Sequence, residues 1–139
     1  MGEVVVELNL ENAIDREMFL RGLMKEEEVR TLNVSAIVDT GAAMLMLPQD
    51  KVEALGLRES GKVVVTYADE RKEERPIAGT VQVKIGKRMA NVDCIVGPPT
   101  SEALLGQVPL EVMDLLVDCQ QQKLVPRPES PILPMLKLK

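Results

Sequence analysis

Short alternations of apolar and polar residues cover most of the chain and predict strands rather than long helices. Every second residue is apolar in two early stretches, 4–10 and 32–38, and again in 63–67, 81–85 and 92–96. A period of two places one set of side chains on a single face of a strand. Glycine and polar residues between the later stretches favour consecutive antiparallel hairpins. The pattern therefore predicts an all-β fold whose alternating apolar residues face the core.

Proline punctuates the strand pattern at two places where a short helix is expected. Pro48 and Pro109 each stand where a first helical turn would begin, because proline is well tolerated there. The two helices are predicted over 48–55 and 109–114. The stretch 12–30 is compatible with a helical turn or with a solvated hairpin or loop, and the pattern leaves it open.

The chain of 139 residues fits one domain, predicted over residues 1–126, followed by a proline-rich tail over 127–139. Because it has one Phe, one Tyr and no Trp, aliphatic residues and the eight methionines are expected to fill the core. The net charge of -5, with both signs interspersed, provides no basic stripe for phosphate contacts. We therefore expect no nucleic-acid partner.

No apolar run approaches the length of a membrane-spanning helix, and the chain enters a strand pattern at once, without the features of a secretory signal. We therefore expect a cytoplasmic protein with no membrane partner. Cys94 and Cys119 lie in apolar segments, and the chain contains no histidine. Both cysteines are expected to be buried free thiols, and neither a metal nor another cofactor is predicted.

The triplet Asp39-Thr40-Gly41 is the strongest chemical signal, because it follows directly after an apolar strand. Glycine permits a tight turn there and places the carboxylate at the strand end, beside buried surface. The alternative interpretation is an ordinary turn in which Asp39 caps its own backbone.

The chain resembles the retropepsin-like aspartic peptidases in three segments that occur in the family's order: 36–42 (AIVDTGA), 103–106 (ALLG) and 116–118 (LVD). The resemblance covers about residues 32–126 and is closest to the stand-alone bacterial relatives of the retroviral proteases. It implies a closed acid-protease barrel with one or two short helices. It also implies a homodimer that hydrolyses polypeptide substrates.

The resemblance assigns roles to individual positions. Asp39 would be the catalytic carboxylate, Thr40 the hydroxyl that ties two active-site loops together, and Gly41 a position of close backbone approach. The loop formed by Leu104, Leu105 and Gly106 would brace the Asp39 turn. Substrate contacts would come from Ala42 beneath the site and from a flap, the hairpin over 67–79, through Tyr67, Ala68, Asp69 and Ile77. Alternation does not decide which residues face the groove among Met44, Leu45, Met46, Tyr67, Ile77 and the Pro98-Pro99 loop.

This chemistry uses two carboxylates that share one proton, and the chain carries a single Asp-Thr-Gly motif. Asp93 and Asp118 lie in alternating strands and are expected at an edge or facing solvent. A twofold dimer would supply the second acid. The flap departs from the family, because 68–75 is densely charged and has no glycine. The alternative function is therefore a dimeric peptide-binding module of the same fold, weakly active or inactive, and an adaptor role of the tail also stays open.

Overall fold

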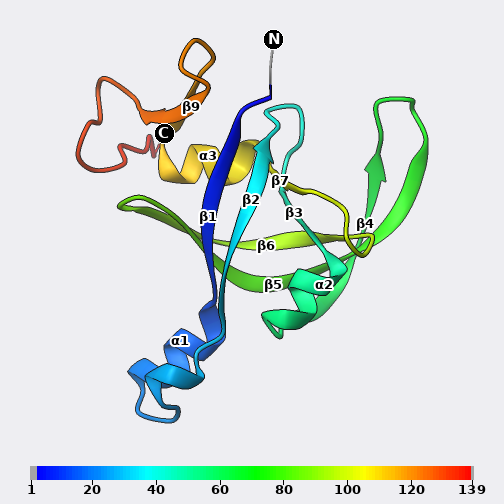
Figure 1. The fold of residues 1–139 in the computed structure, drawn as a ribbon, viewed down its shortest axis with the longest axis vertical. Coiled ribbons are helices and arrows are strands. Elements are labelled where there is room, and N and C mark those ends of the chain that lie inside the picture. The colour runs from blue at the N-terminus through cyan, green and yellow to red at the C-terminus, as the bar shows by residue number, and fades with distance from the viewer. Residues whose placement is uncertain (1–2, 139) are drawn as a thin grey trace.

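The two early alternating stretches form β1 (Val5–Asn12) and β2 (Thr31–Val38), which pair antiparallel in the computed structural model of residues 3–138 (Figure 1). Leu8 and Leu10 of β1 are fully buried, whereas Glu7 and Asn9 between them are exposed. The predicted inward face of this strand is therefore confirmed.

Four further strands close this hairpin into a barrel. The strand β7 (Ala103–Leu105) lies between β2 and β3 (Leu45–Pro48), and β3 then pairs with β6 (Arg88–Gly97). β6 pairs with β5 (Lys72–Ile85), and β5 returns to β1. Six strands thus form a closed ring in the described part of the chain, and the predicted all-β closed barrel is confirmed.

The strand β4 (Arg58–Thr66) pairs with β5 alone and stays outside the ring. The far halves of β4 and β5 rise from the barrel as a long two-stranded arm (Figure 1). The expected consecutive hairpins, β4 with β5 and β5 with β6, are both present.

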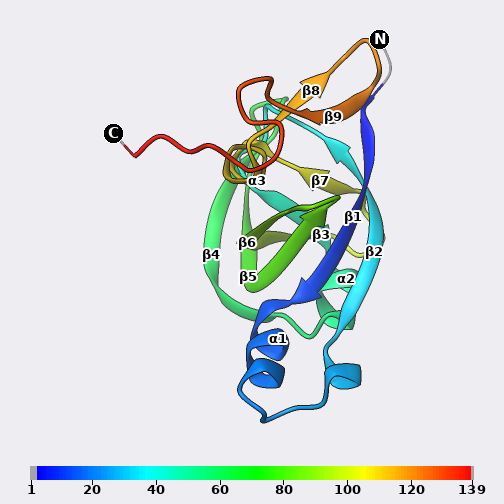
Figure 2. The same ribbon diagram turned by 90° about the vertical axis from the view of Figure 1, so that its left-hand side faces the viewer.

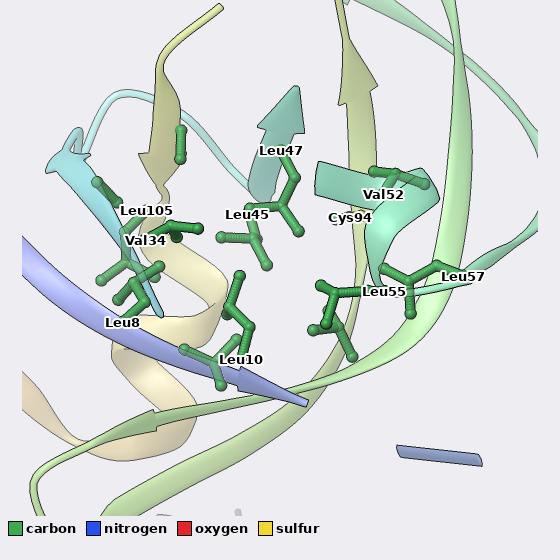
Figure 3. Close-up of a cluster of buried hydrophobic side chains, with 14 of the residues drawn as sticks. Leu8, Leu10, Val34, Leu45, Leu47, Val52, Leu55, Leu57, Cys94 and Leu105 are labelled. Carbon is green, nitrogen blue, oxygen red and sulfur yellow. The ribbon is translucent and has the colours of Figure 1, made fainter. Parts of the chain in front are cut away.

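Aliphatic side chains from the barrel strands and from α2 (Gln49–Ala54) meet in the core (Figure 3). Burying one leucine or valine contributes about 1.5–3 kcal/mol before entropy is counted. The prediction that the methionines help to fill the core is wrong for most of them, because Met113 is the only described methionine that is buried. Met44 and Met46 are partly exposed instead.

The open stretch between β1 and β2 contains α1 (Ala13–Leu20) and the short 3-10 helix η1 (Glu26–Glu28), which protrude from one end of the barrel (Figures 1 and 2). α2 lies within the predicted range, and α3 (Gln107–Met113) begins two residues before Pro109. Residues 3–138 therefore contain three α-helices rather than one or two. No helix in this range is long and apolar enough to span a bilayer.

After α3 the chain forms a separate two-stranded sheet of β8 (Leu115–Asp118) and β9 (Lys123–Pro126), the second of which was not predicted. Cys119 lies in the turn between them and is exposed, so its predicted burial is wrong. Cys94 is buried as expected, and this burial raises the pKa of its thiol to about 12.

The tail beyond β9 is anchored to the end of α3 by the Asp114 carboxylate and by the Arg88 guanidinium, which donates to the carbonyls of Asp114 and Ser130. Asp114 accepts hydrogen bonds from the Arg127 guanidinium, from the Ser130 hydroxyl at 2.6 Å and from the Met135 backbone N–H at 2.9 Å. These hydrogen bonds lower the pKa of Asp114, and the bond from Arg127 contributes most to this shift. The apolar side chains of the tail are mostly exposed, including Ile132, Leu133, Met135, Leu136 and Leu138.

Candidate functional site

The Asp39 turn follows the last residue of β2 and is fixed by backbone hydrogen bonds. The Asp39 N–H donates to the carbonyl of Leu105 at 2.9 Å, and the Ala42 N–H donates to the carbonyl of Asp39 at 3.1 Å. The Asp39 carboxylate accepts from the Gly41 N–H through Oδ1 at 3.0 Å. The capping contact of the alternative interpretation is therefore present, and it holds a partly buried carboxylate in one orientation.

The strand β7 passes directly beside this turn. Leu104 and Leu105 pair with Ile37 and Val38 of β2, and Leu104 also pairs with Met46 of β3. β2 leads into the turn and β3 leads away from it. Each of them pairs with β7, and they do not pair with each other.

Gly106 allows the backbone after β7 to pack against the Asp39 loop. A Cβ at this position would lie 2.7 Å from the carbonyl oxygen of Ala42, 2.9 Å from the carbonyl carbon of Ala43, and closer still to the carbonyl oxygen of Met44. All three are backbone atoms, so they cannot move aside by changing a rotamer. A side chain at this position would therefore displace the loop.

The first turn of α3 closes the other side of the loop. The N–H groups of Gln107 and Val108 donate to the carbonyls of Ala42 and Ala43 at 2.8 and 2.9 Å. Free N–H groups at the start of a helix need such acceptors, and the loop supplies them. The Asp39 turn is thus held by β7 and by α3, two elements that lie more than sixty residues further along the chain.

A groove of about 620 Å³ separates the Asp39 loop from the inner face of the β4–β5 arm. It is lined by Asp39, Gly41, Ala42, Ala43, Met44, Met46, Val63, Val64, Val65, Thr66, Tyr67, Ala68, Arg75, Ile95, Pro98 and Leu104. Most of these side chains are apolar. The groove therefore offers an apolar surface with one carboxylate, Asp39, at the loop.

The tip of the β4–β5 arm is ordered by contacts between its side chains and backbone. The Tyr67 N–H donates to the carbonyl of Arg71 at 2.9 Å, and the Arg71 guanidinium lies 4.4 Å from the centre of the Tyr67 ring. Glu70 has a φ of 66°, in the left-handed region that glycine usually occupies. The turn is shorter than the polar run suggested, because β5 already begins at Lys72.

The structure brings part of the predicted set together at the groove, namely Asp39, Gly41, Ala42, Tyr67, Ala68 and Leu104. Thr40 is exposed next to it, and Leu105 and Gly106 are buried beneath the loop. Asp69 is exposed at the arm's tip, where its carboxylate accepts from the Arg71 N–H at 3.1 Å. Ile77 lies outside the groove lining and pairs with Ile95 within the barrel.

Met44, Met46, Tyr67 and Pro98 line the groove, whereas Leu45 is fully buried in the core. Sequence reasoning missed the valines 63–65, Ile95 and Arg75. The apolar alternation around Val63 can be recognised in the sequence, but the pairing of Val63 with Arg75 across the arm cannot.

Two other carboxylates were expected at an edge or facing solvent. Asp93 is exposed and lies beside Gly79, away from the groove lining. Asp118 is partly exposed and accepts from the N–H groups of Gln120 and Gln121 at 3.0 and 3.1 Å in the β8–β9 turn. Neither lies with Asp39. No group of three or more potential metal ligands is gathered within residues 3–138.

Comparison with protein families gives one match. A family model described as aspartyl protease matches residues 28–108, which is more than half of the chain. The matched segment includes the Asp39 turn, the β4–β5 arm and Gly106. Comparison with curated proteins gives no match.

Proposed function

The chain belongs to the aspartyl protease family, and we propose that it is an endopeptidase that cleaves peptide bonds with two carboxylates, Asp39 from each of two subunits. One observation carries the proposal: among the residues that the structure describes, Asp39 is the only carboxylate lining the apolar groove, and its turn is fixed from two sides by β7 and α3. A carboxylate held in this way can act on a substrate without first reorganising.

The reaction requires two carboxyl groups in different protonation states. The ionised group takes a proton from a water molecule as that water attacks the peptide carbonyl, and the protonated group donates its proton to the carbonyl oxygen. The groove of one subunit supplies one of these groups. A twofold dimer that brings two Asp39 turns together would supply both, and we propose that Thr40, which is exposed beside the turn, ties the two turns together in that dimer.

An extended polypeptide fits the space between the arm and the Asp39 loop. The arm's inner face presents Val63 and Val65, and the opposite wall presents Met44 and Met46. An extended chain can pair with neighbouring backbone while its alternate side chains enter apolar pockets. We propose that the arm is the substrate-covering flap and that Tyr67 and Ala68 contact the substrate, together with Ala42.

Replacement of Asp39 by Asn tests the catalytic assignment, because Asn keeps the shape but cannot exchange the proton. We expect cleavage of a complex peptide mixture between mildly acidic and neutral pH to fall by about 10³-fold or more. Sedimentation should show that the dimer is intact. Cleavage at the wild-type rate by the Asn variant would remove Asp39 from the mechanism.

The second candidate function is a peptide-binding module of the same fold. It is favoured by the arm's tip, where the Tyr67–Arg71 contact and a left-handed Glu70 replace the glycines of retroviral flaps. A binder would hold peptides with equal affinity before and after the Asp39→Asn change and would release no product from either protein. An endopeptidase releases product from the wild type alone.

We propose residues 1–126 as the peptidase unit and 127–139 as an added tail, although residues 1, 2 and 139 lie outside the described part. The cytoplasmic location, the homodimer and the absence of a nucleic-acid partner stay predictions.

A further inference from the structure

Within residues 3–138, two charged residues line the groove: Asp39 and Arg75. Arg75 lies on β5 directly across from Val63 of β4, whose side chain also lines the groove. Its side chain is 20% exposed. A cation is therefore held on the inner face of the flap, against a wall that is otherwise mostly apolar.

The Arg75 guanidinium is oriented by two hydrogen bonds. Nε donates to the carbonyl of Val96 at 2.9 Å, and Nη1 donates to the Glu73 carboxylate at 3.1 Å. Val96 follows Ile95, which pairs with Ile77, so Arg75 lies where β5 separates from β6 at the base of the flap. The guanidinium is thus fixed to the barrel end of the groove.

These two bonds leave part of the guanidinium available. An arginine side chain carries five N–H groups, and within residues 3–138 the Nη2 group of Arg75 donates to no protein acceptor. Glu73 offsets part of the positive charge, but its side chain is 40% exposed and its Oε1 also accepts from the Tyr67 hydroxyl at 3.3 Å. Arg75 can therefore take a second carboxylate while it keeps its present contacts.

We propose that Arg75 determines substrate specificity by binding a carboxylate of the polypeptide, so that the groove prefers Glu or Asp at the position nearest the flap base. The inference rests on the proposed peptidase function and adds a substrate class to it. Hydrogen bonds between a guanidinium and a carboxylate are stronger than those between neutral groups, and an apolar groove shields them less than water does. A neutral side chain at the same position would leave Nη2 without a partner once the substrate excludes water.

Paired peptides test this specificity directly. Each pair is identical except for Glu or Gln at one position, and every position is scanned. Binding is measured on the Asp39→Asn variant, and cleavage is measured on the active protein. We expect one position at which the Glu peptide is favoured by about tenfold in both assays, with the preference decreasing as salt is added.

Arg75→Gln should abolish this preference, and Arg75→Lys should keep part of it because the charge remains. Lys62→Gln is the matched control, since Lys62 precedes Val63, is exposed, and forms no ion pair within the described residues. It should leave the preference unchanged. If Arg75 only held the flap in place, its replacement would change the affinities for the Glu and Gln peptides equally. The ratio of these two affinities therefore isolates the proposed contact with the carboxylate.

The possible outcomes separate this inference from the proposed function. No preference at any position in the wild type, or an unchanged preference in Arg75→Gln, would overturn the role of Arg75 even if cleavage is observed. A Glu preference in binding that depends on Arg75, without cleavage by the wild type, would support the inference and reject the peptidase.

Discussion

At the scale of single residues, the position of the reactive carboxylate depends on a residue without a side chain. Gly106 lies against the backbone of residues 42–44, and the next two N–H groups bind that same backbone. The Asp39 turn is therefore shaped by close backbone approach as much as by its own sequence.

Gly106→Ala should destabilise the protein and disrupt the site together. Its Cβ would lie 2.7 Å from the carbonyl oxygen of Ala42, so the loop has to shift. We expect the free energy of unfolding to fall by about 1–3 kcal/mol, as for other overpacked sites, and peptide cleavage to fall more than stability alone explains. Urea denaturation and cleavage assays measure the two effects.

Gly61→Ala provides the control for this substitution. A Cβ at Gly61 would meet only side-chain atoms of Ile77, at 3.8 Å, which is an ordinary contact distance. Its effect on the free energy of unfolding should stay within about 0.5 kcal/mol. Equal effects of the two alanine substitutions would show that the close approach at Gly106 is unimportant.

At the scale of elements, α1 is joined to the barrel by a small polar cluster. Asn12 caps the helix by accepting from the Asp15 N–H at 3.0 Å, and its amide donates to the Leu55 carbonyl at 2.9 Å. Asp15 in turn accepts from Nε, Nη2 and the backbone N–H of Arg30 at 2.8, 3.0 and 3.1 Å. The charged insertion between β1 and β2 is thus ordered by specific contacts, which a hydrophobic pattern does not encode.

Asp15→Asn should destabilise the protein at neutral pH but not in acid. The hydrogen bond from the Arg30 side chain is the main cause that lowers the pKa of Asp15. A carboxyl whose pKa is lower in the folded state stabilises that state above its unfolded pKa of about 3.9, and this contribution is lost as pH falls through the folded value. Since Arg30 is half exposed, we expect a loss of about 1–2 kcal/mol at pH ~7.

Urea denaturation of both proteins at neutral pH and at successively lower pH measures this difference. Glu17→Gln is the control, because Glu17 pairs with Arg21 on the exposed face of α1 and should contribute about 0.5 kcal/mol or less. A difference between wild type and Asp15→Asn that stays constant into strong acid would contradict the assigned role of the charge.

At the scale of the whole molecule, the proposed active site is complete only in a dimer, and the tail carries several exposed apolar side chains. Ile132 and Leu138 are 81% and 99% exposed. Meanwhile Asp114 holds the preceding residues through Arg127 and Ser130. Asp114 thus holds the tail at Arg127, Ser130 and the Met135 backbone, and the apolar side chains between and beyond these contacts are exposed.

Truncation after Pro126 should weaken the proposed dimer, because it removes both the Asp114 contacts and the apolar residues. Sedimentation at micromolar concentration should show a shift towards monomer, with a parallel loss of cleavage. A chain that ends after Met135 keeps the residues that bind Asp114 but removes Leu136 and Leu138, so a weaker dimer in this chain would be assigned to these two apolar side chains. If the chain truncated after Pro126 stayed fully dimeric, the tail would have no part in assembly.

The sequence by itself predicted the strands β1, β2, β4, β5 and β6, the inward faces of β1 and β2, a helix within 48–55 and the Asp39 turn. These features are local, because a period of two fixes which side chains share a face and because proline and glycine restrict the backbone where they stand. The resemblance of three short segments was sufficient to indicate the family and its barrel. It did not indicate α1, whose order depends on the contact of Asp15 with Arg30.

Only the tertiary structure decided which side chains meet in the groove. Arg75 appeared in the sequence as one charge in a charged run, and its place on the inner face of the flap follows from its register opposite Val63. The insertion of β7 between β2 and β3, which places Gly106 beneath the Asp39 loop, likewise joins segments that are far apart in the chain. Pairing of distant strands depends on the energy of the whole barrel, so no local pattern of residues specifies it.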